Sequence, residues 1–169
     1  MDTISVIFVV AVSVLVTASI MFIIITRMKQ PGEDKISKKT PGTAMQLQAY
    51  ERLVILVDRI ALPHLISRIN QPGATAREMQ LLLTQNIRSE FDYNITQQIY
   101  VTPDAWNAVK NLKEQNLLII NQLANVLPPH ATGLDLNKLL LEFLMNDKKG
   151  TLHEVVSEAL SYEAKKLME

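Results

Sequence analysis

The sequence predicts an all-α protein, in which one N-terminal transmembrane helix is followed by a bundle of five or six helices. Three observations lead to this fold class. Residues 4–26 contain no charged side chain, and residues 27–43 combine basic residues with two Pro-Gly pairs. From residue 44 to residue 169, apolar residues recur at helical spacing. An alternating strand pattern of useful length is absent from the sequence, and no internal repeat is found.

Residues 4–26 are expected to span a membrane. As a helix rising about 1.5 Å per residue, this segment would be about 35 Å long, more than the roughly 30 Å hydrocarbon core of a bilayer. The alternative is a signal peptide cleaved after Val16-Thr17-Ala18. No Lys or Arg precedes the apolar run, however, and the run continues to Ile25, so a membrane helix is favoured.

The segment that follows the predicted span is basic. Its positively charged residues are Arg27, Lys29, Lys35, Lys38 and Lys39. Because an excess of Lys and Arg beside a span stays in the cytoplasm, the N-terminus is expected outside and the C-terminal domain in the cytoplasm. The same five residues are expected to contact anionic lipid headgroups at the membrane surface, which makes the bilayer the first predicted partner.

The soluble part, residues 44–169, is expected to be helical almost throughout. Its expected helices cover residues 44–62, 64–70, 76–99, 103–125, 134–146 and 151–168. Pro63 ends the first helix, and Thr75 with Glu78 forms a capping box that opens the third. Thr102 and Pro103 form the start of the fourth, as an N-cap hydroxyl and a first-turn proline. One face of the third helix carries an i+4 apolar series: Met79, Leu83, Ile87, Phe91, Ile95 and Ile99.

The residue composition limits the kinds of binding site and reaction that the chain can support. The chain has no cysteine, which excludes disulfides and thiolate ligands. Residues 44–169 carry 12 basic and 14 acidic residues, a net charge of −2, whereas a nucleic-acid reader normally has a basic surplus. His64, His130 and His153 have no histidine partner at i+3 or i+4, and no Gly-rich phosphate loop occurs. The sequence therefore predicts no enzyme activity, no cofactor, no metal and no nucleic-acid partner.

The stretch from residue 96 to residue 110 is the expected elbow between two helices. It contains Gln97, Gln98, Tyr100 and Trp106, the only tryptophan of the chain. Tyr and Trp are common anchors of protein interfaces, so these four residues are candidates for an interaction surface. The alternative is structural, with Ile99, Tyr100 and Trp106 closing the elbow and the glutamines capping its exposed end. This structural interpretation is favoured.

Arginines provide a second set of candidate residues. Every basic residue between positions 44 and 100 is Arg, and Arg52 and Arg59 lie two turns apart on the first helix. Because a guanidinium binds carboxylates with two parallel hydrogen bonds, these residues are candidates for structural ion pairs with Glu90 or Asp92 on the third helix. Chance composition on exposed faces explains the pattern equally well.

Several of these landmarks together resemble a known family. They are Gln48-Ala49-Tyr50-Glu51-Arg52-Leu53, the Leu62-Pro63 break, and Thr96-Gln97-Gln98-Ile99-Tyr100-Val101 followed by Trp106. The order of these features along the chain resembles that in a Bacteroidota family of short, single-pass inner-membrane proteins of unknown function. The resemblance covers nearly the whole chain. It implies a bacterial inner (cytoplasmic) membrane location and a helical cytoplasmic domain, and it brings no catalytic residue or ligand.

The function predicted from the sequence is that of a membrane-anchored, cytoplasm-facing helical interaction or scaffold module. Such a module would be an accessory or structural subunit of a larger inner-membrane assembly, or it would self-associate. Its partners would be the bilayer and other membrane-protein subunits or a second copy. The alternative is an enzyme or a small-ligand-binding helical domain without a recognisable motif.

Overall fold

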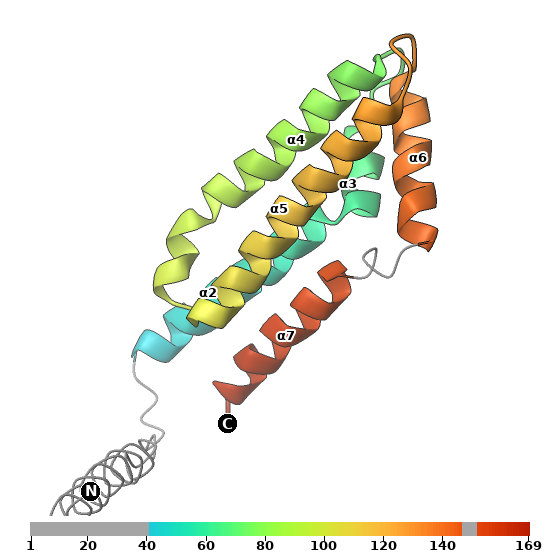
Figure 1. The fold of residues 1–169 in the computed structure, drawn as a ribbon. Helices are drawn as coiled ribbons and strands as arrows, with labels where there is room; N and C mark the ends of the chain where they lie inside the picture. The colour runs from blue at the N-terminus through green and yellow to red at the C-terminus, as the bar shows by residue number, and fades with distance from the viewer. Residues whose placement is uncertain (1–40, 147–151) are drawn as a thin grey trace, which may run out of the picture. The chain divides into compact units, whose positions relative to one another are not determined.

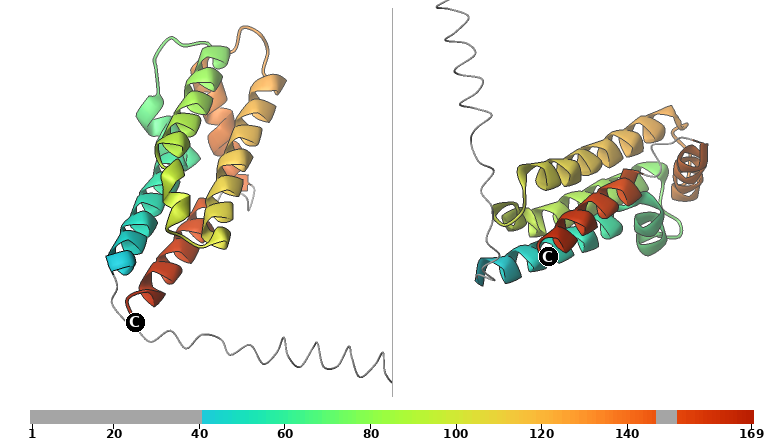
Figure 2. Two further views of the ribbon diagram at one scale, coloured as in Figure 1. Left: turned by 90° about the vertical axis from the view of Figure 1, so that its left-hand side faces the viewer. Right: turned by 90° about the horizontal axis from the view of Figure 1, so that it is seen from below.

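In the computed structural model, which describes residues 41–146 and 152–169, the chain forms a helical bundle (Figure 1, Figure 2). The helices of the described residues are α2 Pro41–Ile60, α3 Leu62–Ile69, α4 Ala76–Tyr93, the 3-10 helix η1 Ile95–Ile99, α5 Pro103–Val126, α6 Gly133–Asn146 and α7 Leu152–Lys166. The all-α prediction is confirmed for these residues, in which no strand forms beyond one isolated bridge.

The predicted membrane span at residues 4–26 lies outside the described residues, as does the basic segment up to residue 40. Among the helices that are described, none is both long and apolar enough to cross a bilayer. Helix α2 begins at Pro41, so residues 41–43 of the predicted 27–43 linker are helical instead. Pro is well suited to a first helical turn, because the N–H group that it lacks would have no partner there.

Helix α4 ends at Tyr93, earlier than the predicted end at residue 99. The chain continues as η1, a 3-10 helix with three residues per turn, so the i+4 register of the apolar series is lost. Ile95 and Ile99 were expected in the core, but they are 43% and 72% exposed. The remaining members of the series, from Met79 to Phe91, are buried as predicted.

Helix α2 lies at the centre of the bundle. It packs against α3, α4, α5 and α7, and Leu53, Leu56, Val57 and Ile60 are fully buried between these helices. Figure 1 shows α4 and α5 as a long antiparallel pair alongside α2, with α7 beside them. The helix was expected to be buried on most sides, but it is buried along one face only, since Glu51, Arg52, Ile55, Asp58 and Arg59 are exposed.

The starts of α4 and α6 are joined by a reciprocal backbone pairing. The N–H of Ala76 donates to the carbonyl of Ala131 at 2.9 Å, and the N–H of Gly133 donates to the carbonyl of Ala74 at 2.7 Å. The pairing satisfies one N–H group in the first turn of each helix that has no partner within its own helix. It also brings two segments that are distant in sequence into backbone contact.

The two paired helix starts have similar capping sequences. Residues 74–80 read Ala-Thr-Ala-Arg-Glu-Met-Gln and residues 131–137 read Ala-Thr-Gly-Leu-Asp-Leu-Asn. Each segment caps its own helix, with Thr75 and Glu78 in one and Thr132 and Asp135 in the other. The backbone N–H of the threonine lowers the pKa of the acidic partner in both segments. The same kind of cap therefore starts both helices at the point where their backbones pair.

We predict that Gly133→Ala destabilises the protein by about 1–2 kcal/mol, because a Cβ at this position would lie 3.1 Å from the Met79 Cβ and 3.2 Å from the Ala74 carbonyl oxygen. The matched control is Gly42→Ala in α2, where nothing lies within 4 Å of the added methyl, and it should be neutral or slightly stabilising. The free energy of unfolding of both variants is measured by denaturant unfolding of the full chain in detergent micelles. Equal effects of the two changes would contradict the close pairing.

A second set of contacts joins helices at the other end of the bundle. The Tyr50 hydroxyl donates to a Glu163 carboxylate oxygen at 2.5 Å, and the Thr102 hydroxyl donates to the same oxygen at 2.7 Å. The Thr102 hydroxyl also accepts from the Ala105 N–H, which caps α5. One carboxylate on α7 thus holds α2 and the start of α5 together.

We expect Tyr50→Phe to cost about 1.5 kcal/mol of stability near neutral pH, because it removes a hydrogen bond to a charged acceptor. Burial, followed by the hydrogen bond to Glu163, raises the pKa of Tyr50. A raised pKa means that the folded state holds this proton more tightly, so the contribution is full below about pH 10 and is lost at higher pH. Unfolding curves at several pH values should give free energies of unfolding for the wild type and for Tyr50→Phe that converge above pH 10. A constant difference would contradict this role of Tyr50.

Candidate functional site

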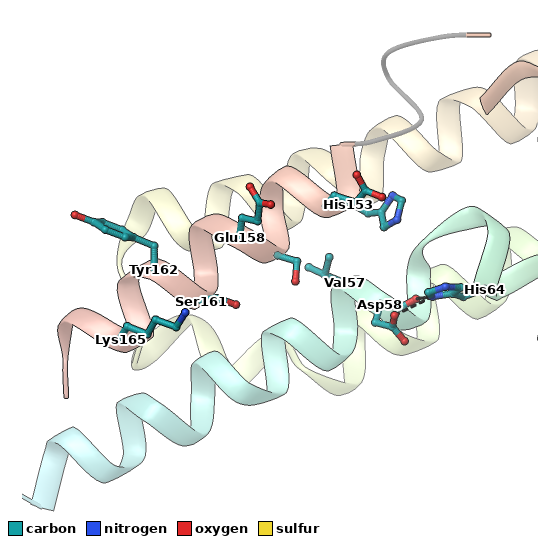
Figure 3. A pocket seen from close by; sticks show the side chains of 10 residues that line it. Val57, Asp58, His64, His153, Glu158, Ser161, Tyr162 and Lys165 are labelled. Carbon is teal, nitrogen blue, oxygen red and sulfur yellow. Dashed lines mark hydrogen bonds and ion pairs between the residues drawn. The ribbon is translucent and has the colours of Figure 1, made fainter. Parts of the chain in front are cut away.

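A groove of about 570 Å³ runs between α7 on one side and α2 and α3 on the other. It is lined by Val57, Asp58, His64, His153, Glu154, Ser157, Glu158, Ser161, Tyr162 and Lys165. In Figure 3, Ser161 and Lys165 point from α7 towards α2, whereas Tyr162 points away. Because carboxylates, imidazoles and an ammonium group from three helices line this groove, it is the first candidate for a ligand site.

Two histidines meet in this groove from different helices. The ring centroids of His64 and His153 are 6.4 Å apart, with an edge-to-face orientation. His64 Nδ1 lies 2.8 Å from the Asp58 carboxylate (Figure 3). The two histidines were not expected to meet, since they are far apart in the chain and their spacing contains no signal that predicts the contact. The fold alone brings them together.

The chemistry available in this groove is limited by exposure. Both side chains of the Asp58–His64 pair are more than half exposed, so solvent weakens their interaction. Within residues 41–146 and 152–169, no group of three or more His, Cys, Asp or Glu side chains is arranged to hold a metal ion. The groove is therefore an open one, with charged and polar side chains along its rim and more apolar than polar surface inside.

A second groove, of about 490 Å³, lies between α2 and α4 on another face of the bundle. Its lining residues are Arg52, Ile55, Arg59, Ser89, Glu90, Tyr93 and Asn94. The large side chains of this groove are two arginines, an isoleucine and a tyrosine. The groove therefore combines apolar area with cationic groups along an exposed stripe of α2.

The ion pair predicted between α2 and α4 forms through Arg59 and Glu90. Arg59 Nη2 donates to Glu90 Oε1 at 2.6 Å, and this hydrogen bond raises the pKa of the guanidinium. Arg68, which was not singled out from the sequence, lies 3.6 Å from the same carboxylate oxygen and donates to the Arg59 carbonyl at 3.2 Å. One carboxylate on α4 therefore joins α2 and α3.

The other two residues of the predicted ion pairs do not take part. Asp92 lies only two positions after Glu90, which turns it about 200° around α4 and away from α2; it is exposed. Arg52 lies opposite Tyr93 and Asn94 in the α2–α4 groove. Among the described residues, the ion pairs between these helices join Glu90 to Arg59 and Arg68, so Glu90 is the acidic partner of the two alternatives and Arg52 takes no part.

The elbow residues divide into two groups. Trp106 packs against the core, and its ring centroid lies 5.0 Å from that of Phe91, which agrees with the structural interpretation. Gln97 is buried and Gln98 is exposed, so the two glutamines do not act together as a cap. Tyr100 and Ile99 are exposed and do not close the elbow. The structural interpretation therefore holds for Trp106 and fails for Ile99 and Tyr100.

The predicted membrane-surface residues, Arg27, Lys29, Lys35, Lys38 and Lys39, lie outside the described residues. Their expected contact with lipid headgroups stays a prediction.

Comparison with known proteins assigns the chain to a family. The profile of a family of unknown function, DUF7935, matches residues 1–167. The chain belongs to this family. The DUF7935 match covers both the bundle and the N-terminal region, in agreement with the resemblance to an uncharacterised family that the sequence indicated. No curated protein and no solved structure gives a significant match.

We predict that Glu90→Gln destabilises the bundle by about 1 kcal/mol, because it leaves two arginines without their shared carboxylate. The control is Glu142→Gln, which removes a carboxylate 3.8 Å from Lys138 in a pair that is exposed on both sides. This control should change stability by less than about 0.5 kcal/mol. Chemical denaturation of the full chain in micelles distinguishes the two, and an equally small effect of Glu90→Gln would show that its ion pair is not structural.

Proposed function

We propose that this member of the DUF7935 family is a membrane-anchored helical module that acts by contact. Its bundle would bind another subunit of a bacterial inner-membrane assembly, or a second copy of the chain, on the cytoplasmic side. The uncharged run at residues 4–26 and the basic residues after it support the anchor and its orientation. The resemblance to Bacteroidota inner-membrane proteins supports the location.

The observation that carries this proposal is the composition of the α2–α4 groove. Ile55 is 52% exposed and Tyr93 is 76% exposed, and Arg52 and Arg59 lie beside them. Tyr and Arg are over-represented at protein interfaces and supply much of the binding energy there. An exposed isoleucine and tyrosine between two arginines is therefore the kind of surface that a protein partner covers.

A second candidate function is the binding of a small polar ligand in the groove between α2, α3 and α7. The contact between His64 and His153, beside Asp58, favours it. This candidate predicts that one small molecule from a panel of polar metabolites raises the melting temperature of the full chain, and that His64→Ala abolishes the shift.

The contact proposal predicts that Ile55→Asp disrupts complex formation. Because the chain has no cysteine, Ser89→Cys can carry a photoactivatable crosslinker as the only label, placed in the α2–α4 groove. In native membranes we expect a discrete adduct, with one partner or with a second copy. Ile55→Asp should reduce its yield about tenfold or more, the effect of a charge in the centre of an interface.

The matched control is Leu118→Asp on α5, since Leu118 is 56% exposed and lies outside the α2–α4 groove. It should leave the adduct unchanged. Equal loss with both variants, or an adduct that Ile55→Asp does not affect, would contradict the proposed contact surface. If the Ser89→Cys label yields no adduct even without a second substitution, and a small molecule raises the melting temperature of the chain, the second candidate is favoured.

A further inference from the structure

Residues 94–101, which join α4 to α5 and are named the tip, expose an unusual amount of apolar surface. Ile95, Ile99 and Tyr100 are all exposed, within six consecutive positions. Exposed large apolar residues occur singly on most protein surfaces, whereas a contiguous group indicates contact with another apolar surface. The tip therefore has the composition of a binding surface.

The tip is also free of charge. No charged residue occurs from position 93 to position 103, although charged residues make up 20% of the chain. Asp92 and Asp104 are the nearest charged residues on the two sides. A protein partner is normally oriented by charged groups around an apolar contact. The tip contains no charged group, and uncharged polar residues separate its apolar side chains.

Hydrogen bonds of the backbone and of the Asn94 side chain fix the conformation of the tip. The side chain of Asn94 is buried and donates to the Glu90 carbonyl at 2.9 Å. The Gln97 N–H donates to the Asn94 carbonyl and the Tyr100 N–H donates to the Gln97 carbonyl, both at 3.0 Å. Gln97 is itself buried. Because these bonds fix the turn, Ile99 and Tyr100 stay exposed instead of folding inward.

The tip lies at the end of the bundle where the described chain begins. The Thr102 N–H, directly after the tip, donates to the Tyr50 hydroxyl at 3.3 Å. Tyr50 is nine residues from Pro41, or roughly 14 Å along a helix. Figure 1 and Figure 2 show the start of α2 and the connection between α4 and α5 at the same end of the bundle. Val126, at the end of α5, lies at the opposite end.

The length of chain before Pro41 limits how far the tip can lie from the predicted membrane span. Residues 27–40 connect residues 4–26 to α2. Even fully extended, this segment reaches at most about 50 Å. If residues 4–26 span the bilayer, the end of the bundle that carries the tip is therefore within reach of the same membrane surface.

We propose that the tip inserts into the interfacial layer of the bilayer in which the chain is anchored. This inference rests on the proposed membrane anchor. Tyr is enriched at the level of the lipid headgroups, and an apolar segment lies about 5–10 Å deep at the boundary of headgroups and acyl chains. Ile95 and Ile99 would enter the acyl region, and Tyr100 would stay at the headgroups. This contact would orient the bundle and leave the α2–α4 groove, with Tyr93, for a partner.

The test uses single fluorescent labels on the full chain. Ile99→Cys and Ile95→Cys place an environment-sensitive fluorophore in the tip, and Val126→Cys places it at the other end of the bundle. Val126 is 73% exposed and Ile99 is 72% exposed, so the two sites are matched. Because the chain has no cysteine of its own, each label is unique. The proteins are reconstituted into vesicles of phosphatidylethanolamine and phosphatidylglycerol that contain a lipid with a nitroxide near the headgroup.

We expect the nitroxide lipid to reduce the fluorescence of both tip labels at least about twofold, as interfacial burial requires, and to leave the Val126 label nearly unchanged. Aqueous iodide should quench the Val126 label and spare the tip labels. Tip labels that respond to iodide but not to the lipid would overturn the proposal. So would tip labels protected from both quenchers, since a protein surface would then cover the tip.

Flotation of the same vesicles after an alkaline carbonate wash separates this proposal from the proposed anchor. Chains that float with the vesicles while their tip labels stay aqueous would refute the tip contact alone. Chains that do not float would refute the anchor and the tip contact together.

Discussion

Burial of α2 is the constraint on which the rest of the bundle depends. Leu53, Leu56, Val57 and Ile60 are fully buried, because α3, α4, α5 and α7 all pack against this one helix. The opposite face of α2, which carries Arg52, Ile55, Asp58 and Arg59, is open to solvent. One open edge of α2 borders the α2–α4 groove, and the other borders the groove with α3 and α7. Both candidate sites are therefore consequences of how the core is filled.

The two ends of the bundle are fixed by different kinds of contact. At one end, backbone groups at the starts of α4 and α6 pair directly, and Gly133 permits the close approach. At the other end, the Glu163 carboxylate accepts from Tyr50 and Thr102. These contacts hold the long helices in register. Consequently the exposed side chains near each end, including those of the tip, are held in defined positions.

Local signals in the sequence predicted most of the helices. Capping residues such as Thr75 and Thr102 mark helix starts, and Pro63 marks a break, because these effects involve only neighbouring residues. The end of α4 was missed, since the apolar spacing continues through Ile95 and Ile99 although the backbone does not. The pairing of Arg59 with Glu90 was predictable from guanidinium chemistry. The meeting of His64 with His153 was not, because it depends on how α7 packs against α2 and so comes near α3.

Contact with a protein partner from a membrane anchor is the role that we propose for this DUF7935 protein. Its most direct test is affinity purification of the tagged full chain from its own membranes in a mild detergent, followed by mass spectrometry of the intact complexes. We expect one partner in fixed stoichiometry or a defined homo-oligomer. Recovery of the chain as a monomer without a partner, stabilised by a single small molecule, would contradict it.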